Sequence, residues 1–175
     1  LISKNFDSEK PYCIIHPGAR KYDKWQFEKF AEIADYFFTR FNIGIILTCG
    51  PGEFDQVENL TQCLSKKVSY TFISTKLSVL LGITASAKFV VCHNGGYMHA
   101  ASAIGVPVVA LFGLTDYRIW KPLGEKSVVL HKDIDCWPCT SKTMKQECWD
   151  GKPECKELIS AEDVVNSIKT LCPEF

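Results

Sequence analysis

Four short segments of the chain combine glycine with polar or charged side chains, and each of them follows an apolar run. The segments are His16-Pro17-Gly18-Ala19, Cys49-Gly50-Pro51-Gly52-Glu53, His93-Asn94-Gly95-Gly96-Tyr97-Met98-His99 and Phe112-Gly113-Leu114-Thr115-Asp116. Glycine allows the backbone to approach a ligand closely, and a helix that starts after such a turn offers free N–H groups to an anion. The pattern therefore predicts an anion-binding site assembled from several loops.

The first and third segments suit a phosphate best. The first is followed by three cations that could make charge-assisted contacts, Arg20, Lys21 and Lys24; the alternative is an ordinary turn with basic surface residues. The third segment places histidine and asparagine side chains around Gly95 and Gly96, and this combination favours a binding site over simple packing. A metal site formed by the two histidines is not expected, because no carboxylate or cysteine is obviously placed to complete it.

The second and fourth segments each contain a carboxylate that can be interpreted in two ways. Glu53 could accept hydrogen bonds from a ribose diol, as acidic residues do in nucleotide-binding sheets, or it could interact with the dipole of the helix that follows. Thr115 and Asp116 could bind a phosphate or a sugar, or they could cap the turn before Ile119. The residues alone leave both alternatives open.

Strand and helix patterns alternate along the chain and position these segments. Apolar runs predict strands at 12–16, 43–48, 70–73, 88–92, 106–112 and 127–130. Helical spacing of apolar residues predicts helices at 25–41, 53–64, 77–86 and 95–104, with a closing helix after an N-cap at Ser160. Such alternation predicts an α/β domain with a doubly wound, Rossmann-like parallel sheet, in which ligands bind beyond the carboxyl ends of the strands.

Composition and charge narrow the class of protein. The 175 residues suit one domain, and the apolar share of 46% is typical of a globular protein. The formal net charge is zero and no basic block stands out, so neither nucleic acid nor an anionic membrane is expected as the main partner. We expect a cytoplasmic chain in which polar residues 1–10 form an interdomain linker and residues 11–175 form the domain.

Four of the nine cysteines lie in one aperiodic segment, residues 133–157. Cys136, Cys139, Cys148 and Cys155 have the spacing C-x2-C-x8-C-x6-C. A C-x2-C pair is often half of a structural zinc site, although the second pair lacks this close spacing. Zinc or another metal, a disulfide and free thiols therefore remain as alternatives, and no metal is expected to be required for function.

In this order, the motifs resemble glycosyltransferase family 9, the family of the ADP-heptose:lipopolysaccharide heptosyltransferases. The resemblance rests on HPGA, LTCGPGE, the glycine-rich segment ending in Met98-His99, GVPVVALFGLTD and W-x-P-x-G, from about Cys13 to Gly124. Members of this family have two Rossmann-like domains that face each other across a cleft (the GT-B architecture). The chain resembles the C-terminal, donor-binding domain. The catalytic base and the lipopolysaccharide acceptor site would then belong to an N-terminal domain, and any inner-membrane association would depend on that domain.

The resemblance also implies roles for individual residues. Gly18 and Ala19 would face the donor phosphates, Glu53 would bind the ribose, and the Gly95-Gly96 turn with His99 would line the pyrophosphate and sugar. Arg20, Lys24 and the Gly95-Gly96 turn would stabilise the leaving diphosphate without a metal.

The chain departs from the family pattern at several of these positions. Asn94 stands where the family usually has Asp, and Gly95 stands where it often has Ser or Thr. The family lysine before the tryptophan falls nearest Asp23, and the proline after the tryptophan is replaced by Gln26. These changes affect the expected sugar more than the expected nucleotide. Two other functions stay open: a stand-alone nucleotide-binding module without catalysis, and a metal-stabilised interaction domain.

Overall fold

A central seven-stranded sheet organises the chain. The computed structural model describes residues 3–139 and 144–175. The strands are β1 (Ser3–Lys4), β2 (Tyr12–His16), β3 (Gly44–Thr48), β4 (Tyr70–Ile73), β5 (Val90–His93), β6 (Val108–Leu111) and β7 (Ser127–Leu130). Their order across the sheet is β1-β4-β3-β2-β5-β6-β7, and all neighbours are parallel except β1 with β4. The predicted doubly wound Rossmann-like sheet is therefore confirmed.

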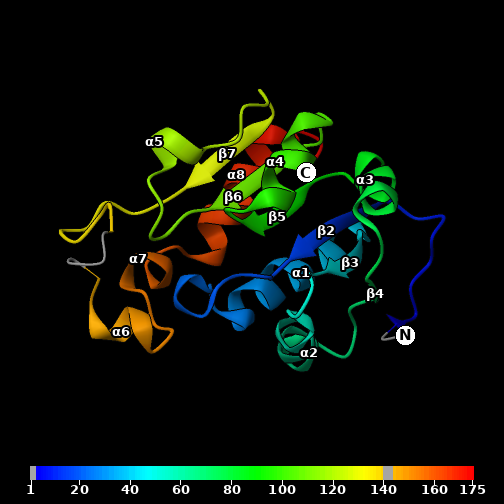
Figure 1. The fold of residues 1–175 in the computed structure, drawn as a ribbon. Coiled ribbons are helices and arrows are strands. Elements are labelled where there is room, and N and C mark those ends of the chain that lie inside the picture. Colours follow the sequence, from blue (N-terminus) through cyan, green and yellow to red (C-terminus); the bar gives the residue numbers. More distant parts are fainter. Residues whose placement is uncertain (1–2, 140–143) are drawn as a thin grey trace.

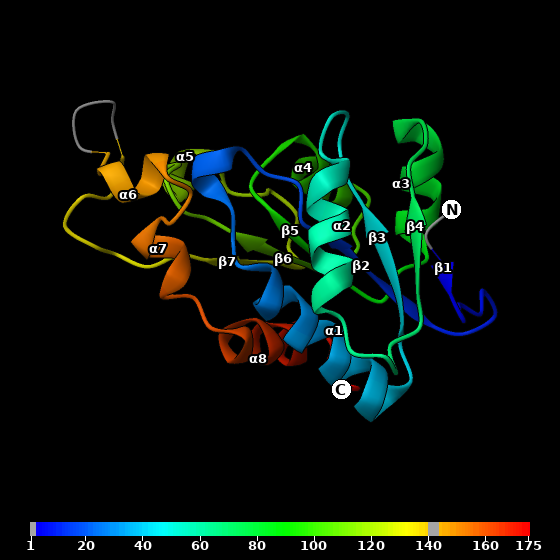
Figure 2. The same cartoon turned by 90° about the horizontal axis from the view of Figure 1, so that it is seen from below.

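Helices cover both faces of this sheet, as Figures 1 and 2 show. They are η1 (Lys21–Asp23), α1 (Phe27–Phe41), α2 (Phe54–Cys63), α3 (Leu77–Ala85), α4 (Gly96–Ala103), α5 (Tyr117–Trp120), α6 (Gln146–Trp149), α7 (Glu154–Glu157) and α8 (Ala161–Leu171). Helices α1, α2 and α8 contribute to the larger buried cluster, and α3 and α4 pack on the opposite face. No helix within the described ranges is long and apolar enough to cross a membrane.

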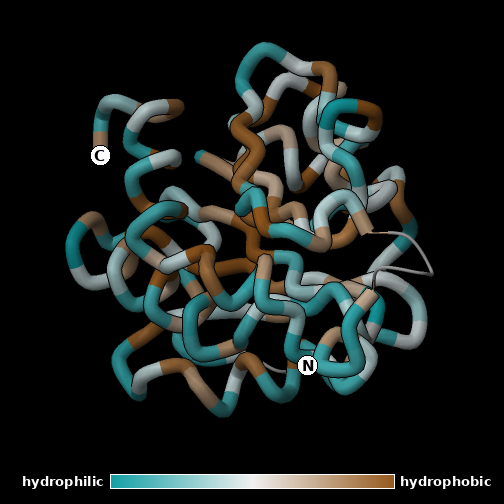
Figure 3. Tube along the Cα trace, turned by 90° about the vertical axis from the view of Figure 1, so that its left-hand side faces the viewer, coloured by the Kyte–Doolittle hydropathy of each residue, from teal (hydrophilic) through white to brown (hydrophobic). Residues whose placement is uncertain are grey.

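Alternation along the strands divides the core into two layers. Ile15 belongs to the cluster beneath α1 and α8, whereas its neighbour Ile14 belongs to the cluster beneath α4. The same alternation holds in β3, where Ile45 and Ile46 point to opposite faces. Successive side chains of a strand point to opposite faces, so a strand buried on both sides is apolar throughout. Figure 3 shows the resulting hydrophobic band through the middle of the trace.

The chain order of the strands creates a switch point between β2 and β5. After β2 the chain adds β3 and β4 on one side, and it then crosses back to place β5, β6 and β7 on the other side. The loops that leave β2 and β5 consequently run over opposite faces of the sheet. Such a divergence opens a crevice beyond the carboxyl ends of the two strands, which is where α/β sheets bind their ligands.

Several segments differ from the sequence prediction, among them α5, which was expected only as a turn before Ile119. Ser3–Lys4, expected within a linker, pairs with β4 at the edge of the sheet. The aperiodic segment 133–157 contains two single-turn helices, α6 and α7, and η1 precedes the long helix α1, which begins at Phe27 rather than Trp25. Residues 1–2 of the expected linker and 140–143 of the cysteine-rich segment lie outside the described residues.

Candidate functional site

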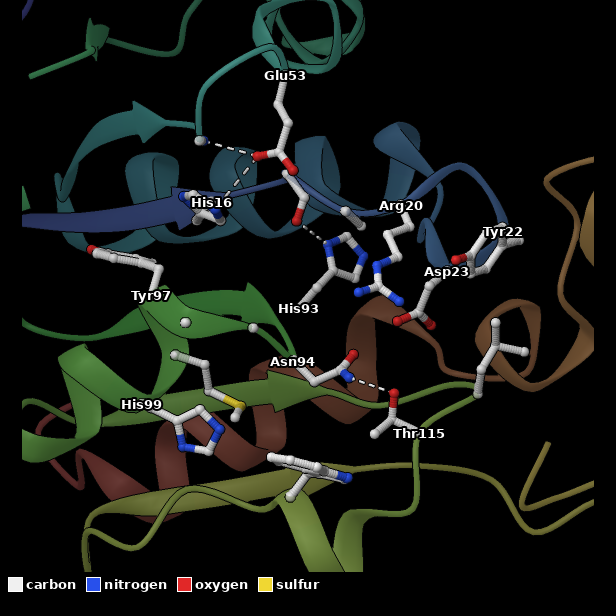
Figure 4. Close-up of a pocket in the computed structure, with 18 of the residues that line it drawn as sticks. His16, Arg20, Tyr22, Asp23, Glu53, His93, Asn94, Tyr97, His99 and Thr115 are labelled. Carbon is white, nitrogen blue, oxygen red and sulfur yellow. Dashed lines mark hydrogen bonds and ion pairs between the residues drawn. The ribbon is translucent and has the colours of Figure 1, made fainter. Parts of the chain in front are cut away.

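A cleft of about 1030 Å³ lies at the switch point between β2 and β5. Ten of the candidate residues line it together: Gly18, Ala19, Arg20, Glu53, Asn94, Gly95, Gly96, His99, Thr115 and Asp116. Residues not predicted as contacts join them, among them His16, Asp23, His93 and Tyr97. Figure 4 shows the labelled side chains converging from the ends of β2 and β5, from the loops after β2, β3, β5 and β6 and from the first turn of α4.

His93 holds the glycine loop of β2 in place. Its Nε2 accepts a hydrogen bond from the Trp25 backbone N–H at 2.9 Å. Because Nε2 is the acceptor, the proton of the neutral ring lies on Nδ1, which is 3.3 Å from the carbonyl oxygen of Gly18 and donates to it. Complete burial is the main reason that the pKa of His93 lies well below its usual value. A neutral histidine of fixed tautomer therefore connects the two loops of the switch point.

The loop after Gly18 is also fixed from the side of α2. Gln56 accepts from the Ala19 N–H at 3.1 Å and donates to the Ala19 carbonyl at 3.0 Å. Ala19 thus lines the cleft, but its backbone N–H already has a partner and is not free for a phosphate. Gln56 could not be identified from the sequence, since its position within an amphipathic helix gives no sign of this double contact.

Glu53 folds back over the glycine loops. Its Oε2 accepts from the Gly50 N–H at 2.8 Å and lies 3.9 Å from His16 Nε2. A Cβ at Gly18 would overlap the same oxygen, so any side chain at this position would displace the Glu53 carboxylate. Burial lowers the pKa of His16 to about 4, and its ring lies against that of Tyr97, tilted by 30° with centroids 4.7 Å apart.

The amino terminus of α4 opens into the cleft without a side chain over it. The first backbone bond of the helix runs from the His99 N–H to the Gly95 carbonyl at 3.4 Å. The earlier N–H groups of an α-helix have no partner within the helix. A Cβ at Gly95 or Gly96 would meet no atom within 4 Å, so packing does not explain these two glycines. They leave room for a ligand at the positive end of α4.

The loops after β5 and β6 are tied together by a side-chain contact. Asn94 Nδ2 donates to Thr115 Oγ1 at 2.8 Å, and Asn94 Oδ1 is buried without a hydrogen-bond partner among the described residues. Asp116 caps α5 by accepting from the Arg118 N–H at 3.0 Å, and its carboxylate also pairs with the Arg118 side chain at 2.7 Å. Hydrogen bonding to Arg118 lowers the pKa of Asp116. The capping role weighed in the sequence analysis is therefore present at Asp116.

The expected cations are placed differently from one another. Arg20 lines the cleft and is exposed, whereas Lys24 is not among the lining residues and lies 4.0 Å from Asp55 on α2. The placement of Lys24 thus corrects the expectation that it faces the cleft: η1 ends at Asp23, which turns inward while Lys24 turns outward. The side chain of Lys21 lies outside the described part of the structure.

Asp23 faces a cation that the sequence did not identify. The fully buried Lys156, at the end of the cysteine-rich segment, donates to the Leu111 carbonyl at 2.6 Å and lies 3.6 Å from Asp23 Oδ1. At 3.6 Å the contact is an ion pair rather than a hydrogen bond, so Oδ1 has no donor among the described residues. Burial raises the pKa of Asp23, and the charge of Lys156 opposes this rise.

The four clustered cysteines surround a second, smaller pocket of about 260 Å³. Cys148 and Cys155 are buried, Cys136 and Cys139 are half-buried, and all four are free thiols. Within residues 3–139 and 144–175, no three His, Cys, Asp or Glu side chains are arranged to hold a metal ion. Cys139 also lines the large cleft, so the two pockets share a wall.

Fold and cleft together define a Rossmann-like domain of the kind that makes up half of a GT-B enzyme. The sequence profile of glycosyltransferase family 9 (heptosyltransferase) matches residues 2–150. The chain therefore belongs to glycosyltransferase family 9.

Individual relatives agree with this assignment. The chain is 29% identical over 168 residues to lipopolysaccharide heptosyltransferase 3 of Escherichia coli K12. This match covers 93% of the chain and 47% of the relative. The solved structure of E. coli ADP-heptose lps heptosyltransferase II superposes with a TM-score of 0.82 at 20% identity, covering 97% of this chain and 49% of the other. E. coli heptosyltransferase WaaC with ADP superposes with a TM-score of 0.71 at 19% identity, covering 95% and 46%. The chain spans about half the length of these relatives.

Proposed function

We propose that the chain is the donor-binding half of a glycosyltransferase and that it binds a nucleoside-diphosphate sugar, ADP-heptose or a close analogue, for transfer to a lipopolysaccharide-core acceptor. The observation that carries this proposal is the open amino terminus of α4, where Gly95 and Gly96 face the cleft with no packing reason to be glycine. A diphosphate is the ligand that such a helix end and Arg20 favour. The solved structure of E. coli heptosyltransferase WaaC is one with ADP, which supports the choice of adenine.

Each end of the cleft suits a different part of such a donor. Glu53, beside His16 and Tyr97, is the acceptor for the ribose hydroxyls once its carboxylate turns from Gly50 toward the ligand. Arg20 and the N–H groups of α4 stabilise the charge that develops on the leaving diphosphate. His93 keeps the Gly18 loop in position and does not contact the ligand through its ring nitrogens, since both are engaged.

The acceptor and the catalytic base belong in this proposal to an N-terminal domain, because the chain spans about half of its relatives. Exposed apolar side chains beside the cleft fit such an arrangement: Ile119, Trp120 and Leu123 are 72%, 56% and 92% exposed. Trp120 also lines the cleft. We place the enzyme in the cytoplasm, where nucleotide sugars are available, with any contact to the inner membrane made by the N-terminal domain.

Calorimetric titration of the chain with ADP, UDP, GDP and their sugar conjugates, with and without magnesium, tests the proposal. We expect metal-independent binding of ADP and ADP-heptose that weakens in Glu53→Ala and in Gly96→Val. Arg20→Ala and Lys24→Ala are a matched pair: the first removes a cation that lines the cleft, and the second removes one that faces Asp55. Equal loss of affinity in both variants, or no binding of any nucleotide by the unmodified chain, would contradict the proposal.

A further inference from the structure

An acidic side chain in a cleft built for an anion requires an explanation. Asp23 lies at the floor of the cleft among groups suited to phosphate, and a carboxylate there repels a diphosphate. Only 11% of its side chain is exposed, so it has little contact with solvent. Burial raises the pKa of Asp23, whereas the charges of Lys156 and Arg20 and the backbone N–H of Leu114 oppose this rise, and Oδ1 has no hydrogen-bond partner among the described residues. A buried carboxylate whose hydrogen bonds are incomplete gains from a further donor, which a ligand in the cleft can supply.

Lys156 supplies part of this compensation and fixes the direction of the carboxylate. Its Nζ lies 3.6 Å from Asp23 Oδ1, and both groups press against Gly113. A Cβ at Gly113 would lie 2.5 Å from Asp23 Oδ1 and 2.7 Å from Lys156 Cε. The close approach therefore depends on glycine at this position. Oδ1 is buried toward Lys156, and Asp23 is one of the residues that line the cleft, so its carboxylate lies within reach of a ligand there.

The position of Asp23 in the cleft indicates which part of a ligand it meets. Figure 4 shows Glu53 and His16 at one end of the cleft and Asp23 with Arg20 and Thr115 at the other, with the His93 ring between them. If Glu53 binds the ribose and the α4 terminus binds the diphosphate, the group beyond the diphosphate reaches Asp23. In a nucleoside-diphosphate sugar this group is the sugar, which presents hydroxyl donors.

We infer that Asp23 is a specificity-determining residue that accepts a hydrogen bond from a hydroxyl of the donor sugar, and that Lys156 is the positioning residue that holds its carboxylate for this contact. This inference rests on the proposed function and assigns the sugar end of the same cleft. Nucleoside diphosphate without the sugar does not use the contact. The affinity ratio of sugar nucleotide to nucleoside diphosphate therefore reports Asp23 specifically.

Titration calorimetry with ADP-heptose and with ADP tests the inference on matched variants. In Asp23→Leu combined with Lys156→Met, both buried charges are removed together, which avoids leaving one of them unpaired. The double variant loses a hydrogen bond to a charged group, and we therefore expect it to bind ADP-heptose about tenfold more weakly, while its affinity for ADP changes less than twofold. Asp23→Asn keeps the shape and an acceptor oxygen, and is expected to lose less than the double variant.

Asp55→Asn is the control, since this carboxylate is exposed on α2 and pairs with Lys24 outside the cleft. An unchanged ratio in the double variant, with both ligands bound normally, would make Asp23 and Lys156 a purely structural pair. An equal loss for ADP and ADP-heptose would assign the pair to the diphosphate site and overturn the inference. If the unmodified chain binds neither ligand, the proposed function itself fails; if it binds ADP but ADP-heptose no more tightly, only the sugar contact fails.

Discussion

Replacing His93 by leucine should destabilise the chain and weaken nucleotide binding, although the ring does not contact the ligand in our proposal. Leucine has a similar volume and keeps an apolar contact with Phe30, whose ring lies 5.5 Å from that of His93. The substitution removes the acceptor of the Trp25 N–H and the donor to the Gly18 carbonyl. The change therefore isolates two hydrogen bonds from the packing around them.

The magnitude follows from the burial of these groups. The Trp25 N–H is left unsatisfied in the core, which costs about 1–3 kcal/mol, and the longer bond to Gly18 adds about 1 kcal/mol. We expect the free energy of unfolding to fall by about 2–4 kcal/mol. The Gly18 loop must then be ordered by the ligand itself, so ADP should bind about tenfold more weakly.

Urea unfolding followed by circular dichroism measures the first effect, and calorimetric titration with ADP measures the second. His99→Leu is the matched control, because His99 lies on α4 in the same cleft but is exposed. We expect His99→Leu to change the free energy of unfolding by less than about 0.5 kcal/mol. If His93→Leu lowers the free energy of unfolding by no more than His99→Leu does, the role of His93 as the link between the two loops is refuted.

Three further predictions concern His16, Gly18 and the clustered cysteines. The pKa of His16 is about 4 in the folded chain against an ordinary 6.5, so the unfolded chain takes up the proton at a higher pH than the folded chain, and folding becomes less favourable as the pH falls from 6.5 toward 4. In His16→Gln, the fall in the free energy of unfolding between pH 7 and 4.5 should be smaller by about 2 kcal/mol. The same pH dependence in the variant and the unmodified chain, measured by urea unfolding, would contradict this. Gly18→Ala should displace Glu53 and reduce ADP affinity about tenfold with little loss of stability. Gly82→Ala is the control, because a Cβ at Gly82 would meet no atom within 4 Å, and it should leave ADP affinity unchanged. Equal ADP affinity in the two variants would refute the close approach at Gly18. Mass spectrometry after alkylation should find Cys136 modified well before Cys155, which is buried and whose pKa is raised to about 12. If Cys136 is instead protected, removal of the protection by a chelator would favour a bound metal, and its removal by a reductant would favour a disulfide.

The main elements of the sheet could be predicted because apolar runs determine them almost locally. β6 is apolar throughout and β3 is apolar up to its last residue, Thr48, and both are buried along their whole length, as expected for strands covered on both faces. The polar segments that follow β2, β5 and β6 meet for a topological reason, since parallel strands bring their carboxyl ends to one edge. β1 could not be predicted, because its two residues form a strand only through pairing with β4, which is distant in sequence.

The side-chain contacts inside the cleft could not be predicted, because they depend on side-chain directions that the spacing of residues in the sequence does not reveal. A shift of one residue in the turn η1 exchanges Asp23 for Lys24 in the cleft, and neither residue type indicates the direction. Lys156 lies in a segment without periodicity, where a lysine is ordinarily expected at the surface. Its burial follows from the carbonyl of Leu111 and the carboxylate of Asp23, two partners supplied by other elements.

The described residues of the cysteine-rich segment consequently contribute to the cleft around Asp23. It supplies Lys156 beneath Asp23, and Pro138, Cys139 and Met144 line the cleft on the same side, whereas Glu53 and His16 come from the loops of β2 and β3. In our proposal, a change in this segment, whether by substitution or by a bond among its thiols, alters the surroundings of Asp23, whereas Glu53, the proposed ribose acceptor, stays in place. We therefore expect variation in residues 133–157 to alter which sugar is accepted while the nucleotide preference, set by the sheet loops, is retained.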